Sequence, residues 1–138
     1  MASEKVRFSD HEGDVMSLSV LPDVDRNLFV SGSCDATVRL WDVRSGECAM
    51  TLTGHESDIN SVQLFPDAKA VGTGSDDSSC RIFDFRACAQ VSEFRNEMLL
   101  CGITSVAFSR SGRVLLAGYD DYNCLAWDVL GSQVTDAS

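Results

Sequence analysis

The chain contains three copies of one short motif at nearly equal intervals. Each copy is an aspartate, five intervening residues, an aromatic residue and a second aspartate: Asp35 to Trp41-Asp42, Asp77 to Phe83-Asp84, and Asp121 to Trp127-Asp128. The aromatic positions lie 42 (83 − 41) and 44 (127 − 83) residues apart. Internal repeats of this length are stacking units, which bury their apolar faces only against neighbouring copies. The repeat therefore predicts a binding scaffold rather than a catalytic pocket.

A period of about 40–45 residues ending in Trp-Asp is typical of a four-stranded propeller blade. Short strand-like runs separated by turn residues follow one another along the chain, and no stretch keeps a helical period. We expect strands at residues 5–8, 15–21, 27–33, 37–43, 48–53, 59–65, 70–74, 80–85, 90–94, 103–109, 114–118 and 124–129. The predicted fold class is all-β: a partial β-propeller with about three four-stranded antiparallel blades, in units of about 9–53, 54–95 and 96–138.

Neighbouring blades should bury alternating apolar residues between them. The expected core residues are Leu18, Val30, Leu40, Ile59, Val62, Ile82, Val106, Leu115 and Leu125. The run at 5–8 is assigned to the outer strand of a blade that precedes Asp14. Since a propeller needs roughly four to eight blades, three blades form part of a larger propeller or complete a ring with another chain. Two open blade faces should make the isolated chain aggregation-prone or dependent on a partner.

The charge balance disfavours one class of partner. The chain has 21 acidic and 11 basic residues and a net charge of −10. Such a surface repels a phosphate backbone, so no nucleic-acid partner is expected, whereas a basic protein surface would be attracted. The alternative is that the excess acid only keeps the domain in solution.

The cysteine pattern shows neither a zinc site nor a disulfide framework. No two of the six cysteines, at 34, 48, 80, 88, 101 and 124, have the Cys-x-x-Cys spacing. We interpret them as reduced core thiols, Cys80 and Cys124 in particular, in an intracellular compartment. No apolar run approaches the roughly 18 residues of a membrane span, so no span is expected. No cofactor and no metal site are predicted.

Polar residues recur within each unit and predict buried hydrogen-bond networks. In the first unit, the imidazole of His11 would bridge Asp35 and Ser31, and the hydroxyl would meet the indole N–H of Trp41. The second unit has His55, Thr73 and Asp77, but Phe83 replaces the tryptophan. The third unit has Asp121 and Trp127, with Ala117 at the hydroxyl position and no histidine.

The same residue types also make up a Ser–His–Asp catalytic triad. A hydrolase using His11 or His55 is therefore the alternative from a different functional class. Against it, the trio recurs at the blade period, and the chain has no Gly-x-Ser-x-Gly elbow. Gly72-Thr-Gly74 lacks the third glycine and the following helix of a phosphate-binding loop.

Longer strings carry a resemblance to a known family. They are Gly13–Ser19, Phe29–Asp35, Gly54–Asn60, Gly74–Asp77, Cys101–Ser105 and Leu116–Asp121. Through them the chain resembles the WD-repeat family and, within it, the β subunits of heterotrimeric G proteins. The resemblance covers about residues 8–129. It implies three consecutive blades from the second half of a seven-bladed propeller.

The resemblance also implies a function. The chain would be a scaffold in receptor-coupled signal transduction that binds a G-protein α subunit and effectors, with no chemistry of its own. A generic WD-repeat adaptor in another complex is the alternative. Binding of a γ subunit is not expected, because the N-terminal helix that the family uses for it has no counterpart here. The expected location is the cytoplasm, including the cytosolic face of the plasma membrane through partners.

Two kinds of connection should open on one face of the blades and present a protein-binding surface. Asp14, Met16, Asp58 and Asn60 fall in or just after the loops between blades; Cys34, Asp76 and Asp120 fall in the turns between second and third strands. The alternative is that Asp76 and Asp120 only cap their turns. The resemblance implies that the positions of Asp14, Met16, Cys34, Asp58 and Asp76 face the α subunit.

Overall fold

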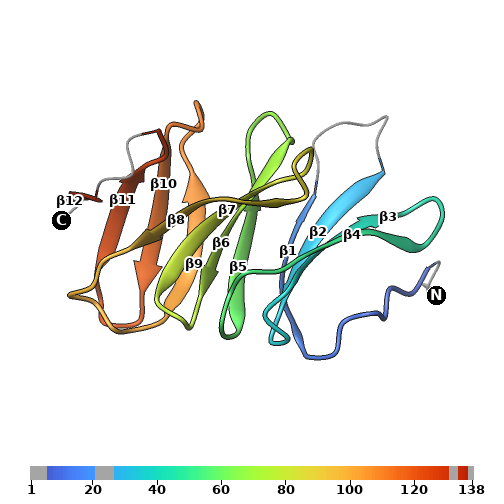
Figure 1. Cartoon of the computed structure of the whole chain (residues 1–138), viewed down its shortest axis with the longest axis horizontal. Coiled ribbons are helices and arrows are strands. Elements are labelled where there is room, and N and C mark those ends of the chain that lie inside the picture. The colour runs from blue at the N-terminus through green and yellow to red at the C-terminus, as the bar shows by residue number, and fades with distance from the viewer. Residues whose placement is uncertain (1–5, 21–26, 131–133, 137–138) are drawn as a thin grey trace, which may run out of the picture.

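The structure is a computed structural model that describes residues 6–20, 27–130 and 134–136. These residues form strands, turns and loops with no helix, so the predicted all-β class is confirmed. Three antiparallel sheets lie side by side along the chain (Figure 1). Each sheet pairs strands that are consecutive in the sequence, which is the expected blade topology.

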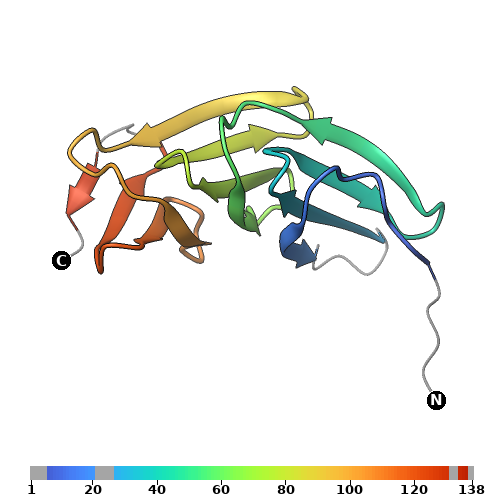
Figure 2. The same ribbon diagram turned by 90° about the horizontal axis from the view of Figure 1, so that it is seen from below.

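The first sheet consists of β1 (Val15–Val20), β2 (Leu28–Ser33), β3 (Val38–Asp42) and β4 (Glu47–Leu52). The second consists of β5 (Ile59–Leu64), β6 (Ala70–Ser75), β7 (Ser79–Asp84) and β8 (Ala89–Arg95). The third consists of β9 (Ile103–Phe108), β10 (Val114–Tyr119), β11 (Cys124–Asp128) and β12 (Val134–Asp136). The sheets follow an arc, with β4 and β8 on its convex side and β1, β5 and β9 on its concave side (Figure 2).

Most strand ends agree with the sequence prediction to within one residue. The prediction for residues 5–8 is wrong for its described part, since residues 6–8 form no strand. Instead Phe8 packs edge-on against Phe29 and Trp41, with ring centroids 5.0 and 5.4 Å apart. An outer strand needs a hydrogen-bonded neighbour, and none of the described strands pairs with this segment. Lys5 and Leu21, at the ends of two predicted strands, lie outside the described residues.

The core is divided between the two blade-to-blade interfaces. The first cluster joins the first and second blades through Val30, Val38, Leu40, Leu52, Ile59, Val62, Leu64, Val71 and Phe83. The second joins the second and third blades through Cys80, Ile82, Phe94, Ile103, Val106, Leu115, Ala117, Tyr119, Leu125 and Trp127. Apolar burial is thus shared between sheets rather than enclosed within one, as expected for stacking repeats.

Two interpretations from the sequence need correction. Leu18, expected in the core, is 60% exposed, because it lies on the face of β1 that points away from the second blade. The other predicted core residues are buried. All six cysteines are free, but only Cys80 is buried, whereas Cys88 and Cys124 are exposed. The interpretation of Cys124 as a core thiol is therefore wrong in this structure.

Glycines allow the blades to approach closely. A Cβ atom at Gly32 would lie 2.6 Å from Ile59 Cγ2, and one at Gly74 would lie 2.5 Å from Ile103 Cγ2. At Gly72 the nearest atom would be a ring carbon of Phe108 at 2.7 Å. These separations are shorter than van der Waals contact, so the interfaces require residues without a side chain at these positions.

Serine hydroxyls of one blade accept hydrogen bonds from backbone amides on the inner strand of the next blade. Ser17 Oγ accepts a hydrogen bond from the Val62 amide, and Ser61 Oγ accepts one from the Val106 amide, each at 3.1 Å. Ser19 Oγ accepts from the Leu64 amide at 3.1 Å. An inner strand has a sheet partner on one side only, so these bonds pair amides that its own sheet leaves free.

We predict that Gly74→Ala lowers the free energy of unfolding by about 1–3 kcal/mol. The added methyl group meets β-branched Ile103 and Val106, whose side chains are stiff at χ1. Urea titration followed by circular dichroism measures the change. Ala89→Val, which adds methyl groups on the exposed start of β8, is the control and should change stability by less than about 0.5 kcal/mol. Equal losses in the two variants would contradict the packing argument.

Candidate protein-binding surface

One aspartate closes the turn between the second and third strands of each blade. The carboxylates of Asp35, Asp77 and Asp121 accept hydrogen bonds from the amides two residues further on, at 2.9, 2.9 and 3.1 Å. The residue between them is left-handed in each case: Ala36 (φ 68°), Ser78 (φ 73°) and Tyr122 (φ 74°). The turns are thus capped by these aspartates, which leaves Asp76 and Asp120 beside them without that task.

A chain of hydrogen bonds runs through the first blade. His11 Nδ1 lies 2.9 Å from Asp35 Oδ2, and His11 Nε2 lies 2.6 Å from Ser31 Oγ. Trp41 Nε1 donates to the same hydroxyl oxygen at 2.7 Å. Because the carboxylate can only accept, Nδ1 carries the imidazole proton, and Nε2 accepts from the Ser31 hydroxyl. Every polar group of the chain from indole to carboxylate then has a partner.

The buried carboxylates stay ionised because of their donors. Burial would raise the pKa of Asp35, but hydrogen bonds from the Thr37 hydroxyl, from His11 and from two amides hold it well below its ordinary value. Burial would likewise raise the pKa of Asp77, which hydrogen bonds from His55, Ser79 and the Glu56 amide lower well below that value. Hydrogen bonds to the charged form outweigh desolvation at both sites.

The second blade repeats the arrangement with one substitution. His55 Nδ1 lies 2.8 Å from Asp77 Oδ2, and His55 Nε2 lies 2.5 Å from Thr73 Oγ1. Phe83 stands at the position of Trp41 and provides no indole donor. Arg81 is buried beside this group and lies 3.5 Å from Asp77 and 2.8 Å from Glu93. The network of this blade is thus extended by a paired cation, which compensates the charge of its carboxylate.

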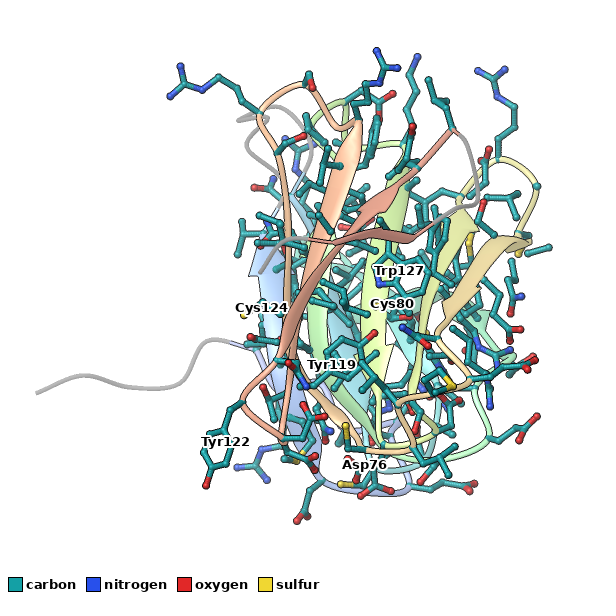
Figure 3. All side chains as sticks on the ribbon, turned by 90° about the vertical axis from the view of Figure 1, so that its left-hand side faces the viewer. Asp76, Cys80, Tyr119, Tyr122, Cys124 and Trp127 are labelled. Atoms are coloured by element: carbon teal, nitrogen blue, oxygen red, sulfur yellow. The ribbon has the colours of Figure 1, made fainter. Side chains whose placement is uncertain are left out.

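The third blade has no such chain. Trp127 Nε1 and Tyr119 Oη are buried without a hydrogen-bond partner in the part of the chain that the structure describes. Tyr119 belongs to the same core cluster as Trp127, and both side chains lie near Cys80 (Figure 3). The Asp121 carboxylate bonds to the amide and side chain of Asn123 and lies beside the Cys101 thiol, but it meets no histidine. In this blade, packing replaces the polar network.

The geometry gives no support to a catalytic triad. His11 and His55 do join a hydroxyl to a carboxylate, which is the order of groups in a triad. However, the Ser31 and Thr73 hydroxyls are buried, and Ser31 Oγ is occupied by the indole donor. A nucleophile needs access to substrate beside an oxyanion hole. The buried trios therefore act as structural links.

The seven residues predicted for protein binding gather at one end of the blades. The Cys34 amide donates to the Asp14 carbonyl at 2.8 Å, and the Asp76 amide donates to the Asp58 carbonyl at 2.9 Å. The corresponding bond of the third blade joins Asp120 to Gly102 at 3.1 Å. These bonds fix each turn beside the loop that enters its blade. We call Asp14, Met16, Cys34, Asp58, Asn60, Asp76 and Asp120 the acidic surface.

The Cys34 and Cys101 thiols lie close to carboxylates at this end of the blades. The pKa of the Cys34 thiol is raised by a hydrogen bond to Asp58, by burial, and by the charges of Asp58, Asp14 and Asp76. Burial and the neighbouring carboxylates Asp121 and Asp120 raise the pKa of Cys101. Negative charges disfavour a nearby thiolate, so each of the two thiols lies close to carboxylates.

Each blade has a β-bulge in its inner strand, and in the first two blades the extra residue belongs to the acidic surface. The register of the inner strand shifts at the same place in β1, β5 and β9, which leaves Met16, Asn60 and Thr104 as the extra residues. Bulges redirect side chains and are common next to functional sites. Asn60 Nδ2 donates to Asp76 Oδ1 at 2.6 Å and to the Ile103 carbonyl at 2.9 Å, so it also ties the second blade to the third.

The prediction from the sequence missed two neighbours of this surface, Thr104 and Cys101. Thr104 follows Met16 and Asn60 at intervals of 44 residues (60 − 16 and 104 − 60), so the repeat period could have found it. Gly102 stands where Asp14 and Asp58 stand in the other blades. A Cβ atom there would lie 2.6 Å from Asp76 Oδ1, so a larger residue at this position would require the Asp76 side chain to move.

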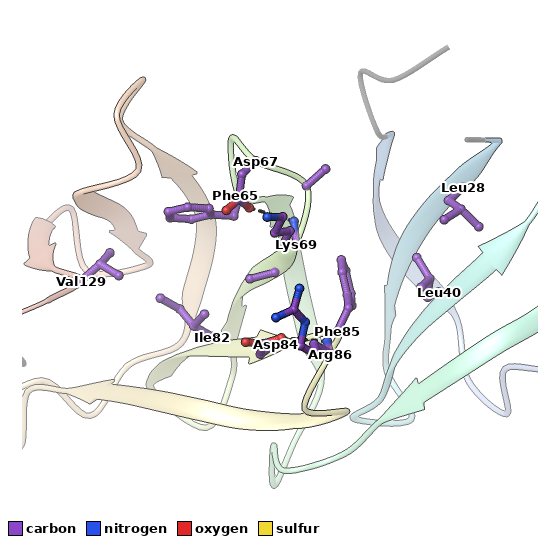
Figure 4. Close-up of a pocket in the computed structure, with 12 residues that line it drawn as sticks. Leu28, Leu40, Phe65, Asp67, Lys69, Ile82, Asp84, Phe85, Arg86 and Val129 are labelled. Carbon is purple, nitrogen blue, oxygen red and sulfur yellow. Dashed lines mark hydrogen bonds between the residues drawn. The ribbon is translucent and has the colours of Figure 1, made fainter. Parts of the chain in front are cut away.

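The opposite end of the blades has a groove lined by apolar and charged side chains. A groove of about 590 Å³ lies there, with Leu28, Leu40, Phe65 and Phe85 among its apolar walls and Lys69 and Arg86 at its edge (Figure 4). Asp76 and Tyr122 lie at the other end (Figure 3). The groove thus has carboxylates and cations together, Asp67 and Asp84 with Lys69 and Arg86, whereas the seven residues of the acidic surface include no cation.

Two further kinds of feature are absent from the described residues. No helix among them is long and apolar enough to cross a membrane. The described side chains include no group of three or more histidines, cysteines, aspartates or glutamates arranged to hold a metal ion.

Comparison with known proteins gives one consistent result. A family model described as "G protein beta WD-40 repeat protein" matches residues 1–137. The chain is similar to proteins named "Guanine nucleotide-binding protein subunit beta", with 52% identity over 132 residues in Oryza sativa subsp. indica and 49% over 132 residues in Zea mays. The identity to the Arabidopsis thaliana protein is 45% over 130 residues. Each match covers 91% of this chain and 34% of the relative, so the chain spans about a third of its relatives' length.

We predict that Asp35→Ala lowers the melting temperature more than Asp121→Ala does. Asp35 accepts hydrogen bonds from His11, Thr37 and the Glu12 amide, whereas Asp121 bonds locally to Asn123. Unsatisfied groups in a broken buried network typically cost about 1–3 kcal/mol each. Differential scanning calorimetry of the two variants provides the comparison, and equal shifts would argue against the network.

A second prediction concerns acid. The folded-state pKa values of Asp35 and Asp77 lie below the unfolded value of about 3.9, so their stabilisation is present above that pH and is lost as pH falls further. Asp77→Asn should lower the free energy of unfolding at pH 7 and weaken its dependence on pH below about 4. Urea titrations over this range measure both effects. An unchanged pH dependence in the variant would exclude Asp77 as a contributor.

Proposed function

Because this chain belongs to the G protein β WD-40 repeat family, we propose that it is a signalling scaffold that binds a G-protein α subunit and downstream effectors. The family membership confirms the resemblance found in the sequence. The scaffold relays receptor activation through binding and performs no chemistry of its own. Since the chain spans about a third of its relatives, it supplies only part of the surface that a complete β subunit would present.

The acidic surface is the observation that carries this proposal. Asp14, Asp58, Asp76 and Asp120 sit on loops and turns held side by side by backbone hydrogen bonds, in a negative field that also raises the pKa of Cys34. Asp76 and Asp120 are exposed and do not cap their turns. Exposed carboxylates on a rigid scaffold are suited to pair with cations of a partner.

The surface also has an apolar part. Met16 is exposed at the bulge of β1, next to the loop that carries Asp14. A methionine side chain is flexible and polarisable, and it adapts to the shape of an apolar partner residue. We therefore expect a partner surface with lysine or arginine side chains around an apolar contact. Charge would accelerate the encounter, and the buried apolar contact would slow dissociation.

The proposed location follows from the proposed partners. The scaffold would act in the cytoplasm and at the cytosolic face of the plasma membrane, where its partners hold it. A γ subunit is not part of this proposal, which concerns the blade ends alone.

Charge reversal tests the proposal. Asp58→Lys together with Asp76→Lys should slow association with a GDP-loaded α subunit and weaken binding at least about ten-fold, most strongly at low salt. Surface plasmon resonance at two ionic strengths measures both rates. The β circular dichroism spectrum should not change, since neither side chain is in a core cluster.

The matched control reverses two charges at the opposite end. Glu47→Lys together with Asp67→Lys changes the net charge by the same amount on exposed residues far from the acidic surface. This control should retain most of the association rate at both salt concentrations. If the acidic-surface variant binds the α subunit as well as the control does, the surface has been assigned wrongly. Binding to another partner alone would favour a generic adaptor.

A further inference from the structure

Two large apolar side chains project into solvent from the loop that joins the second blade to the third. Met98 and Leu100 are each 88% exposed. The residues that alternate with them, Leu99 and Cys101, pack against the core cluster shared by these two blades. The loop therefore holds one set of side chains inward and presents the other set outward.

The conformation of this loop is fixed by its own contacts. The Met98 amide donates a hydrogen bond to Asn96 Oδ1, and the Leu99 amide donates one to the Asn96 carbonyl, each at 2.9 Å. Leu99 also anchors the loop in the core. A rigid surface loses less conformational entropy when it binds a partner, so a loop of this kind is suited to binding.

The first two blades show that the scaffold does not need apolar residues here. Leu100 follows Glu12 and Glu56 at intervals of 44 residues (56 − 12 and 100 − 56), and Met98 follows Gly54 at the same interval. Glu56 is exposed too, and both its loop and the loop of Leu100 lie between two described blades. The exposure of Leu100 is thus a property of this loop position and does not arise at an end of the chain.

Carboxylates flank the two apolar side chains. Glu97 is exposed on the same loop, which ends at Gly102 beside the turn between β10 and β11 (Figure 1). The Gly102 carbonyl accepts a hydrogen bond from the amide of the exposed Asp120 at 3.1 Å. We call Glu97, Met98, Leu100 and Asp120 the third-blade patch. Its apolar centre and acidic rim complement a partner that has lysine or arginine around an apolar centre, and they disfavour an anionic membrane.

The backbone of the loop indicates the form of this partner. Residues 96–102 belong to none of the described strands, and the turn at Asn96 closes its own hydrogen bonds. A partner strand therefore finds no free strand edge to pair with, and recognition depends on side chains. An α-helix satisfies its own backbone and presents only side chains, with apolar residues three and four positions apart on one face. A helix with an apolar face bordered by cations thus matches the third-blade patch.

We propose that the third-blade patch binds a partner protein through an amphipathic basic helix. Met98 and Leu100 contact the apolar face of the helix, and Glu97 and Asp120 pair with its lysines or arginines. The patch shares only Asp120 with the acidic surface, and none of its members is among the positions that the resemblance implies to face the α subunit. It is therefore a separate docking site, and it does not rest on the proposed α-subunit contact.

A synthetic peptide provides the probe. A helix of about 18 residues, with leucines three and four positions apart and lysines elsewhere, has the proposed chemistry. Fluorescence anisotropy with the whole chain should show binding that Leu100→Glu weakens at least about five-fold. This change introduces the residue that the other two blades have, so the circular dichroism spectrum should not change.

The sign of the effect separates the patch from general charge attraction. The chain has a net charge of −10, so a basic peptide bound by charge alone would bind more tightly to a variant with one more glutamate. Val91→Glu is the matched control, on a side chain that is 56% exposed on the outer strand β8. It should not weaken binding. Unchanged or tighter binding in Leu100→Glu, or equal weakening in both variants, overturns the proposal.

A second peptide tests the helical form. It has the same composition, but leucine and lysine alternate, so its apolar face forms only in an extended strand. It should bind at least about five-fold more weakly than the helical peptide. Equal affinity of the two peptides overturns the assignment of a helical partner.

Methionine methyl groups report where the helical peptide binds. In a chain labelled with ¹³C at these methyl groups, the peptide should shift the signal of Met98 and leave that of Met16 in place. Met16 is exposed on β1 within the acidic surface, and Met16→Leu and Met98→Leu assign the two signals. A shift of the Met16 signal alone places the helix on the acidic surface and overturns the proposal.

The GDP-loaded α subunit distinguishes this site from the proposed function. Leu100→Glu should leave its association rate unchanged, whereas the double reversal at Asp58 and Asp76 slows it. Loss of α-subunit binding in Leu100→Glu overturns the separation of the two sites. Failure of the unsubstituted chain to bind the α subunit contradicts the proposed function only, because the peptide measurements do not involve that subunit.

Discussion

The close approach of neighbouring inner strands holds the rest of the structure in place. A blade of four short strands cannot enclose its own apolar side chains, so its core exists only between blades. Glycines such as Gly74 let the next blade come within van der Waals contact of the backbone, and serines such as Ser61 pair with its free amides. Apolar burial and hydrogen bonding therefore act at the same contact, which sets the angle between one sheet and the next.

The three blades have the same strand order but are stabilised by different interactions. The first two blades enclose a histidine that joins a hydroxyl to an ionised aspartate, and in the second a paired Arg81 lies beside it. Such a network stabilises only when each member has a partner. The third blade lacks the histidine, and there Tyr119 and Trp127 pack in an apolar cluster. The second blade keeps its network without the indole donor, whereas the third blade, which lacks both the histidine and the hydroxyl, has packing in place of the network.

The residues that hold each turn in place differ from the residues that the turn exposes. In each blade one aspartate caps the turn by accepting hydrogen bonds from backbone amides. The residue before it does not cap the turn. Because the blades repeat the same loop and turn at the same end, Asp58, Asp76 and Asp120 come together although they lie far apart in the sequence. A rigid framework with variable polar residues at one end is the usual design of binding repeats.

The sequence alone determined the repeat, the all-β class, the positions of β1 to β11 to within one residue and the pairing of His11 with Ser31 and Asp35, but it did not predict β12. These features depend on local patterns: the period of the aromatic residues, alternating apolar residues and turn chemistry.

The tertiary structure alone decided which blade faces are covered. It left Leu18 and Cys124 in solvent and kept residues 6–8 out of a strand, since each of these outcomes depends on whether a neighbouring sheet is present. It also placed Thr104 and Cys101 beside the acidic surface and assigned turn capping to Asp77 rather than Asp76. The contacts between blades have no local signal in the sequence, because they join residues more than 40 positions apart, such as Ser61 and Val106.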